Sequence, residues 1–222
     1  MKYQFVIKEN NKSVIIFFTG WSTTASLYKD FKTNCSDLLV IYNYNNLILE
    51  SKIIDLISCY NDVYIIGWSL GVWAASCFFS NLNINIKRSI AINGTKFPID
   101  DKRGINKQIY LNTIENLSEK NLRKFQMRMC NSKSSFEELL NMDLASDIDS
   151  LKNELIFIKN SIEKDLYNNC FHWSKVYIGT QDRIFLYKNQ QNAWNDTEQV
   201  LIDNAHYDLN LFQKIILYEF GN

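Results

Sequence analysis

A serine set between two glycines, where an apolar strand-like run meets an apolar helix-like run, constrains this fold more than any other feature. Residues 67–71 read Gly-Trp-Ser-Leu-Gly, after a run typical of a buried strand (63–66) and before a helical run that reaches Phe79. In a sharp strand-to-helix turn, side chains two residues before and after the serine would collide, so both positions favour glycine. The free N–H groups of the following helix favour negative charge beside it. The pattern therefore predicts a strained Ser69 at the carboxyl end of a buried strand.

Other short apolar runs alternate with helical sequence along the chain. Such alternation is typical of an α/β fold with a mostly parallel sheet covered by helices on both faces. A length of 222 residues suits one domain, residues 1–222. The expected strands are 3–7, 13–18, 38–42, 63–66, 87–92, 175–178 and 199–202, and the expected helices outside the middle of the chain lie before Phe31 and at 47–60, 72–79 and 209–220.

The strand pattern stops between residues 97 and 171. This part is more charged and has helical spacing at 118–130, 134–142 and 149–166, with no Gly/Ser-rich or Pro-rich linker. We interpret residues 97–171 as a helical lid inserted within the domain.

The charge balance and the apolar runs exclude several classes of protein. Lys and Arg number 24, as do Asp and Glu, so the basic excess typical of nucleic-acid binding is absent. No apolar run approaches the roughly 18 residues of a membrane helix, and the N-terminal residues do not resemble a signal peptide. The five cysteines are scattered, and Cys59 and Cys77 lie in apolar runs. We expect buried free thiols in a reducing cytosol, and hence a cytoplasmic protein.

No metal or cofactor is expected. The two histidines are distant in sequence and no H-E-x-x-H motif is present, so the chain offers no zinc site. No G-x-G-x-x-G follows the first buried strand, which disfavours a dinucleotide fold.

A serine nucleophile needs a base, and histidine is the usual one. His206 lies just beyond a strand end, on the same sheet edge as Ser69, whereas His172 precedes a strand and lies on the opposite edge. The third group must be a carboxylate that orients the imidazole. Asp182 follows the strand at 175–178 and gives the order Ser, Asp, His. Its rivals are residues 203 and 208, whose proximity to His206 in sequence favours turn and capping roles instead.

A tetrahedral oxyanion needs two N–H donors. One should be the backbone N–H of Leu70, directly after the serine. The other should be that of Trp21, in the loop after the strand at 13–18, where Gly20 allows the backbone to approach a substrate. The Trp21 indole can equally serve core packing or wall an acyl pocket.

Taken together, the segments Phe-Thr-Gly-Trp-Ser (18–22), Gly-Trp-Ser-Leu-Gly-Val (67–72), Gly-Thr-Gln-Asp (179–182) and Asn-Ala-His (204–206) resemble the α/β-hydrolase superfamily. Within it, the chain resembles the pimeloyl-acyl-carrier-protein methyl ester esterases of biotin synthesis, in particular the short BioG type. The resemblance implies a serine esterase that hydrolyses the methyl ester of pimeloyl-acyl carrier protein, with this carrier protein as partner. It covers nearly the whole chain, although the insert matches only in position and character.

The helix expected at 118–130 gains a role from this resemblance. Its basic residues Arg123, Lys124 and Arg128 and its apolar Phe125 could dock an acidic carrier protein and cover an acyl channel. The alternative is a solvated face on a lid helix. Two further functions stay open: a general short-chain carboxylesterase or acyl thioesterase, because ester and thioester pass through the same oxyanion, and a hydrolase-like scaffold that only binds.

Overall fold

One seven-stranded sheet forms the centre of the computed structural model, which describes residues 1–167 and 170–220. The spatial order is β1-β3-β2-β4-β5-β6-β7. The edge strand β1 runs antiparallel to β3, and all other neighbours are parallel, which confirms the expected α/β fold. The strands are β1 (Lys2–Ile7), β2 (Ser13–Phe18), β3 (Ser36–Tyr42), β4 (Asp62–Trp68), β5 (Ile86–Ile92), β6 (Lys175–Gly179) and β7 (Glu198–Ile202).

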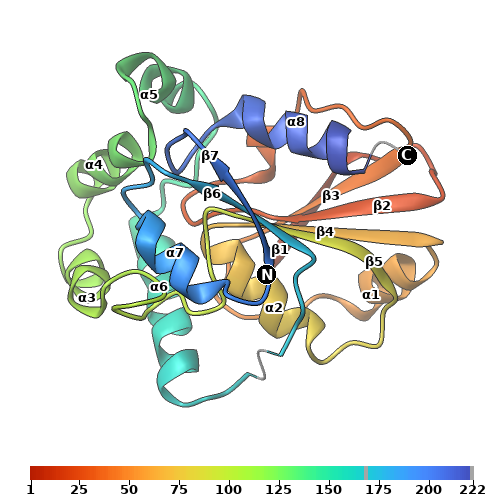
Figure 1. The fold of residues 1–222 in the computed structure, drawn as a ribbon, viewed down its shortest axis with the longest axis horizontal. Coiled ribbons are helices and arrows are strands. Elements are labelled where there is room, and N and C mark those ends of the chain that lie inside the picture. The colour runs from red at the N-terminus through yellow and green to blue at the C-terminus, as the bar shows by residue number, and fades with distance from the viewer. Residues whose placement is uncertain (168–169, 221–222) are drawn as a thin grey trace.

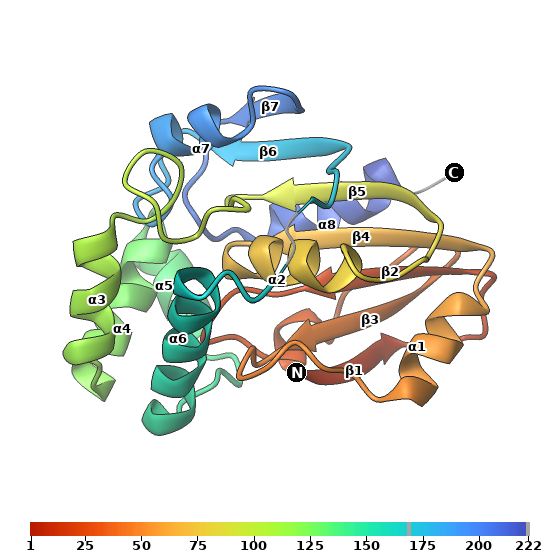
Figure 2. The same ribbon diagram turned by 90° about the horizontal axis from the view of Figure 1, so that it is seen from below.

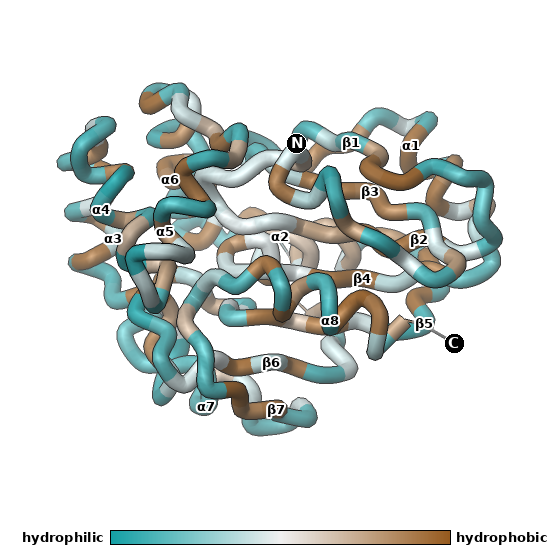
Figure 3. Tube along the Cα trace, turned by 90° about the horizontal axis from the view of Figure 1, so that it is seen from above, coloured by the Kyte–Doolittle hydropathy of each residue, from teal (hydrophilic) through white to brown (hydrophobic). Residues whose placement is uncertain are grey.

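Both faces of the sheet are buried, so the central strands are apolar at successive positions. In β2, Ile16 and Phe18 join one core while Ile15 and Phe17 join the other, as the period of two requires. Helices α1 (Ser51–Ser58) and α2 (Leu70–Phe79) cover the first face, and helix α8 (Leu209–Glu219) covers the second (Figure 1). The short 3₁₀ helix η1 (Ala25–Tyr28) also packs into the core on the second face. Figure 3 shows hydrophobic stretches along the central strands between these layers.

Four helices follow β5 and gather at the end of the sheet toward which β5 and β6 point (Figure 2). They are α3 (Lys107–Glu115), α4 (Glu119–Met129), α5 (Lys133–Leu140) and α6 (Ile148–Glu163). Because the parallel strands end here, this helical segment lies over the edge where functional groups collect in such sheets. Helix α7 (Tyr187–Ala193) follows β6 on the same side.

Several expected boundaries were wrong. The helix expected at 47–60 begins only at Ser51, because Leu47 and Leu49 reach the core from an irregular segment. The helical sequence before Phe31 forms only the 3₁₀ turn η1. Helices α3 and α7 were not expected as separate elements.

Candidate active site

The turn between β4 and α2 holds Ser69 in a conformation that L-residues rarely adopt, with φ 59° and ψ −126°. A Cβ at position 67 would lie 2.7 Å from the Trp173 ring. A Cβ at position 71 would lie 2.7 Å from the carbonyl oxygen of Thr19 and well inside contact distance of that of Phe18. Gly71 thus allows α2 to pack directly against the end of β2, and Gly67 leaves room for the Trp173 ring and the backbone of Val72. Both positions are crowded, which is why the turn that holds Ser69 favours glycine there, as predicted.

The three residues expected to form a triad lie in one chain of hydrogen bonds. The Ser69 Oγ is 2.9 Å from Nε2 of His206, and Nδ1 of His206 is 2.8 Å from Oδ2 of Asp182. The side chains of His206 and Asp182 are fully buried. A carboxylate at Nδ1 fixes the tautomer that leaves Nε2 free to accept the serine proton, and this geometry is what general-base activation of a serine requires.

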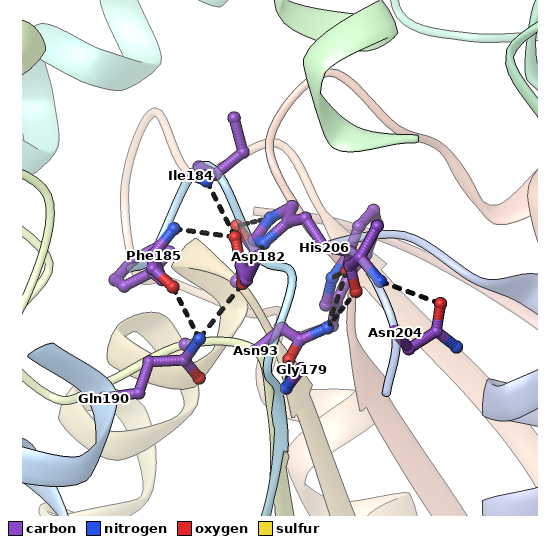
Figure 4. A network of polar contacts seen from close by, with 12 residues as sticks. Asn93, Gly179, Asp182, Ile184, Phe185, Gln190, Asn204 and His206 are labelled. Carbon is purple, nitrogen blue, oxygen red and sulfur yellow. Dashed lines mark hydrogen bonds and ion pairs between the residues drawn. The ribbon is translucent and has the colours of Figure 1, made fainter. Parts of the chain in front are cut away.

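Asp182 accepts four hydrogen bonds (Figure 4). Its Oδ1 receives the backbone N–H groups of Ile184 and Phe185, at 2.7 and 2.9 Å. Its Oδ2 receives Nε2 of Gln190 at 3.1 Å in addition to the imidazole. Donors on both oxygens fix the plane of the carboxylate.

His206 is also held through its backbone. Its carbonyl oxygen accepts the indole N–H of Trp68 at 2.9 Å and the side-chain amide of Asn93 at 3.0 Å. The Asn93 Oδ1 accepts the backbone N–H of Gly179 at 2.7 Å, so one buried amide joins the ends of β5 and β6 to the histidine loop (Figure 4). Sequence reasoning missed this role of Asn93, although its place at a strand end was a signal.

The rival residues lie elsewhere. His172 is exposed, just before β6. Asp208 caps α8 by accepting the backbone N–H of Leu211, and Asp203 accepts the side-chain amide of Gln181 at 2.7 Å. These are the capping and turn roles expected for the two aspartates.

Trp21 and Leu70, the expected oxyanion donors, line the same cavity as Ser69. Leu70 opens α2, so its backbone N–H has no acceptor within the helix. Within residues 1–167 and 170–220, neither this N–H nor that of Trp21 donates to a protein acceptor. Both are available to a ligand, and their catalytic role stays a prediction.

The loop at residues 19–22 is fastened to the helical segment. The Trp21 indole N–H donates to the carbonyl oxygen of Leu151 in α6 at 3.0 Å, and the backbone N–H of Ala145 donates to Ser22 at 3.2 Å. The position of the Trp21 backbone therefore depends on helices inserted far along the chain.

The cavity at Ser69 measures about 100 Å³, and its lining is mostly apolar apart from two arginines, which form its basic margin. Arg128 of α4 and Arg183 both line it. Sequence reasoning did not single out Arg183, although it directly follows Asp182. The apolar lining comes from the sheet edge and from the helical segment: Trp21, Leu70, Ile105, Ile109, Tyr110, Phe125, Leu155, Ile184 and Leu186.

The expected docking residues do not all lie on one side of α4. Phe125 and Arg128 line the cavity at Ser69. Lys124 and Arg128 line a shallow hollow beside it, which also includes Arg183. Arg123 instead lines a different groove, between α4 and residues 140–146. The structure thus brings three of the four expected residues to the neighbourhood of the cavity and leaves Arg123 apart.

The cysteines correct one expectation. All five are free, but only Cys77 and Cys130 are buried, whereas Cys59 is exposed at the end of α1. Within the described ranges, no cluster of three or more His, Cys, Asp or Glu side chains could hold a metal ion. None of the helices in those ranges has the length and apolar character needed to cross a membrane.

The chain has relatives among known proteins. Residues 1–219 match the family model described as pimeloyl-ACP methyl esterase BioG. The chain is 39% identical over 205 residues to a malonyl-[acyl-carrier protein] O-methyltransferase of Bacteroides fragilis, covering 91% of this chain and 41% of that longer protein. A second relative, from Haemophilus influenzae, is 34% identical over 90% of each chain and is described as an uncharacterised protein.

Solved structures agree with the fold. The crystal structure of BioG from H. influenzae superposes with a TM-score of 0.87 at 31% identity, covering 96% of this chain and 97% of that one. An esterase from Exiguobacterium antarcticum, at 12% identity, superposes with a TM-score of 0.72 over 99% and 95% of the two chains, a likeness of fold alone. The chain therefore belongs to the BioG family and is a carboxylic ester hydrolase with the α/β-hydrolase fold.

Proposed function

We propose that this protein is a serine esterase that hydrolyses the methyl ester of pimeloyl-acyl carrier protein in biotin biosynthesis. The observation that carries the proposal is the hydrogen-bonded chain from Ser69 through His206 to Asp182, opening into an apolar cavity. Membership of the BioG family supports the substrate. The B. fragilis relative, whose name describes methyl transfer to malonyl-acyl carrier protein, is consistent with chemistry on carrier-linked methyl esters.

In the proposed reaction, Ser69 Oγ attacks the ester carbonyl while Nε2 of His206 takes the hydroxyl proton. The backbone N–H groups of Trp21 and Leu70 stabilise the oxyanion. The intermediate collapses when His206 returns the proton to the methoxy oxygen, which releases methanol and leaves a pimeloyl ester on Ser69. Water then attacks this ester as His206 takes its proton. The bond between the acyl carbon and Ser69 Oγ breaks as His206 returns the proton to Oγ, and pimeloyl-acyl carrier protein leaves with a free distal carboxylate.

The helical segment would act as a lid whose basic margin receives the acidic carrier protein. Arg128 and Arg183 line both the cavity and the adjacent hollow, which also includes Lys124 and Lys133. Such clustered cations attract an acidic partner and direct the linked acyl chain to the cavity. We place the reaction in the cytoplasm, since all five thiols are free, as is usual in a reducing compartment.

The test of the function is rescue of biotin-free growth in a host that lacks its own pimeloyl methyl ester esterase. Wild type should rescue and Ser69→Ala should not. Ser80→Ala, which removes a hydroxyl at the far end of α2, serves as the matched control and should rescue. Failure of a well-expressed wild type to rescue, with retained activity on a simple ester or thioester, would indicate the general carboxylesterase or thioesterase instead. If wild type hydrolyses none of these substrates, the remaining alternative is a hydrolase-like scaffold that only binds.

Carrier docking has its own test. Arg128→Glu and Arg183→Glu should each slow turnover of the carrier-linked substrate by about 10-fold, because a reversed charge repels an acidic partner. Arg123→Glu, on the other groove, is the matched control. Equal losses on the carrier-linked substrate and on p-nitrophenyl butyrate would contradict a docking role.

A further inference from the structure

Gln190 is a fully buried side chain of α7 that contacts the candidate catalytic acid. Its Nε2 lies 3.1 Å from Oδ2 of Asp182 and 2.7 Å from the carbonyl oxygen of Phe185 (Figure 4). Both N–H bonds of the amide are therefore used, and one of them is directed at the same oxygen that receives the His206 imidazole.

The other end of this amide has no partner. The Oε1 of Gln190 is buried and accepts no hydrogen bond from the described residues. Leaving such a buried acceptor unpaired destabilises the folded state, because the oxygen has lost its hydrogen bonds to water. The opposite orientation would be worse, because it would turn Oε1 toward two acceptors, the Asp182 carboxylate and the Phe185 carbonyl. The two N–H donors of Gln190 are thus both used, whereas its side-chain oxygen is left without a hydrogen bond from the described residues.

The remaining donors to Asp182 act on the other oxygen. Its Oδ1 accepts the backbone N–H groups of Ile184 and Phe185, which hold this oxygen against the segment that follows Asp182. Only Oδ2 contacts His206, and in the described part of the chain Gln190 is the other group that donates to it. Rotation of the carboxylate, or withdrawal of Oδ2 from the ring, is therefore opposed by Gln190.

We propose that Gln190 is a positioning residue that holds Oδ2 of Asp182 against the His206 imidazole. The inference rests on the proposed serine mechanism. Gln190 acts only through Asp182, since it is not among the residues that line the cavity at Ser69. Its effect should appear in the chemical step and not in substrate binding, because the substrate does not touch it.

The test compares Gln190→Met, Gln190→Glu and Gln199→Met with wild type on p-nitrophenyl butyrate. Methionine has a similar length but no donor, so kcat should fall by about 10-fold while KM stays within about twofold, as expected for one charge-assisted hydrogen bond. Glutamate keeps the shape but donates only when protonated. Its kcat should therefore fall further as pH rises and the new carboxyl ionises beside Asp182. Gln199 is the control, because its amide donates to Trp194 at 2.9 Å, away from the triad.

A fluorophosphonate that labels activated serines separates this inference from the proposed function. If wild type is not labelled, the serine mechanism itself fails. If wild type is labelled and the two Gln190 variants fold, label and turn over as wild type does, only the role of Gln190 is refuted. The role of Gln190 would also be refuted if the loss of kcat in each variant only followed its loss of thermal stability, and if the glutamate and methionine variants had equal kcat values at every pH. Should the methionine variant not fold, the pH profile of the glutamate variant decides alone.

Discussion

Glu154 in α6 should make the stability of this protein fall as pH rises through the weakly acidic range. The residue is 3% exposed, and burial raises the pKa of its carboxyl from 4.5 to about 7 despite a hydrogen bond from the backbone N–H of Tyr44. Folding therefore takes up a proton at pH values between about 4.5 and about 7. Because the native state then holds more protons than the unfolded state, the free energy of unfolding decreases with rising pH in this window.

The magnitude follows from the two pKa values. Their difference of about 2.5 corresponds to about 3 kcal/mol, at about 1.4 kcal/mol for each pH unit. This stability is fully present below about pH 4.5 and is lost by about pH 7. Glu154→Gln keeps the shape and an acceptor for Tyr44 but cannot ionise. The variant should be within about 1 kcal/mol of wild type at pH 5 and exceed it by up to about 3 kcal/mol at pH 8.

Urea unfolding followed by tryptophan fluorescence at pH 5 and pH 8 provides the measurement. Glu115→Gln, the same change at an exposed residue of α3, is the control and should shift the unfolding free energy by less than about 0.5 kcal/mol. The reasoning is refuted if Glu154→Gln and wild type lose stability equally between the two pH values.

Three further predictions concern the elbow, the thiols and the unused histidine. Gly71→Ala places a Cβ 2.7 Å from the Thr19 oxygen, so α2 must shift outward; kcat on p-nitrophenyl butyrate should fall by about 100-fold, and an unchanged rate would contradict the packing argument. Burial raises the pKa of Cys77 to about 12 and that of Cys130 to about 11. A thiol reagent at pH 8 should therefore modify only the three exposed cysteines quickly in the native protein, and rapid reaction of all five would contradict this. His172→Ala should leave esterase activity within twofold of wild type, whereas a loss comparable to that of His206→Ala would reopen the choice of base.

Ser69, Asp182 and His206 could be placed from sequence because each lies at or shortly after the end of a recognisable apolar strand. Parallel strands bring their carboxyl ends to one edge, so position along the chain was enough to predict which groups meet. The same reasoning placed Trp21 and Leu70 beside the serine. Their roles in catalysis are predictions that the proposed assays test.

Gln190 could not be found in this way. It lies on α7, whose sequence Tyr-Lys-Asn-Gln-Gln-Asn-Ala has almost no apolar period, so the helix itself was not expected. The position of Arg123 on a different groove has another cause. Helix α4 turns Leu122, Gln126 and Met129 inward, and the face that a helix buries depends on packing that basic residues at neighbouring positions do not reveal.

The hydrogen bond from the Trp21 indole to Leu151 has a consequence for the order in which the site matures. The two residues are 130 positions apart, so the loop that carries Trp21 leaves the ribosome long before its anchor exists. A nascent chain that ends before α6 already contains the turn that carries Ser69. The Leu151 carbonyl that accepts the Trp21 indole N–H has not yet been synthesised at that stage. The loop that carries the Trp21 backbone is thus fixed only after α6 has been synthesised and folded.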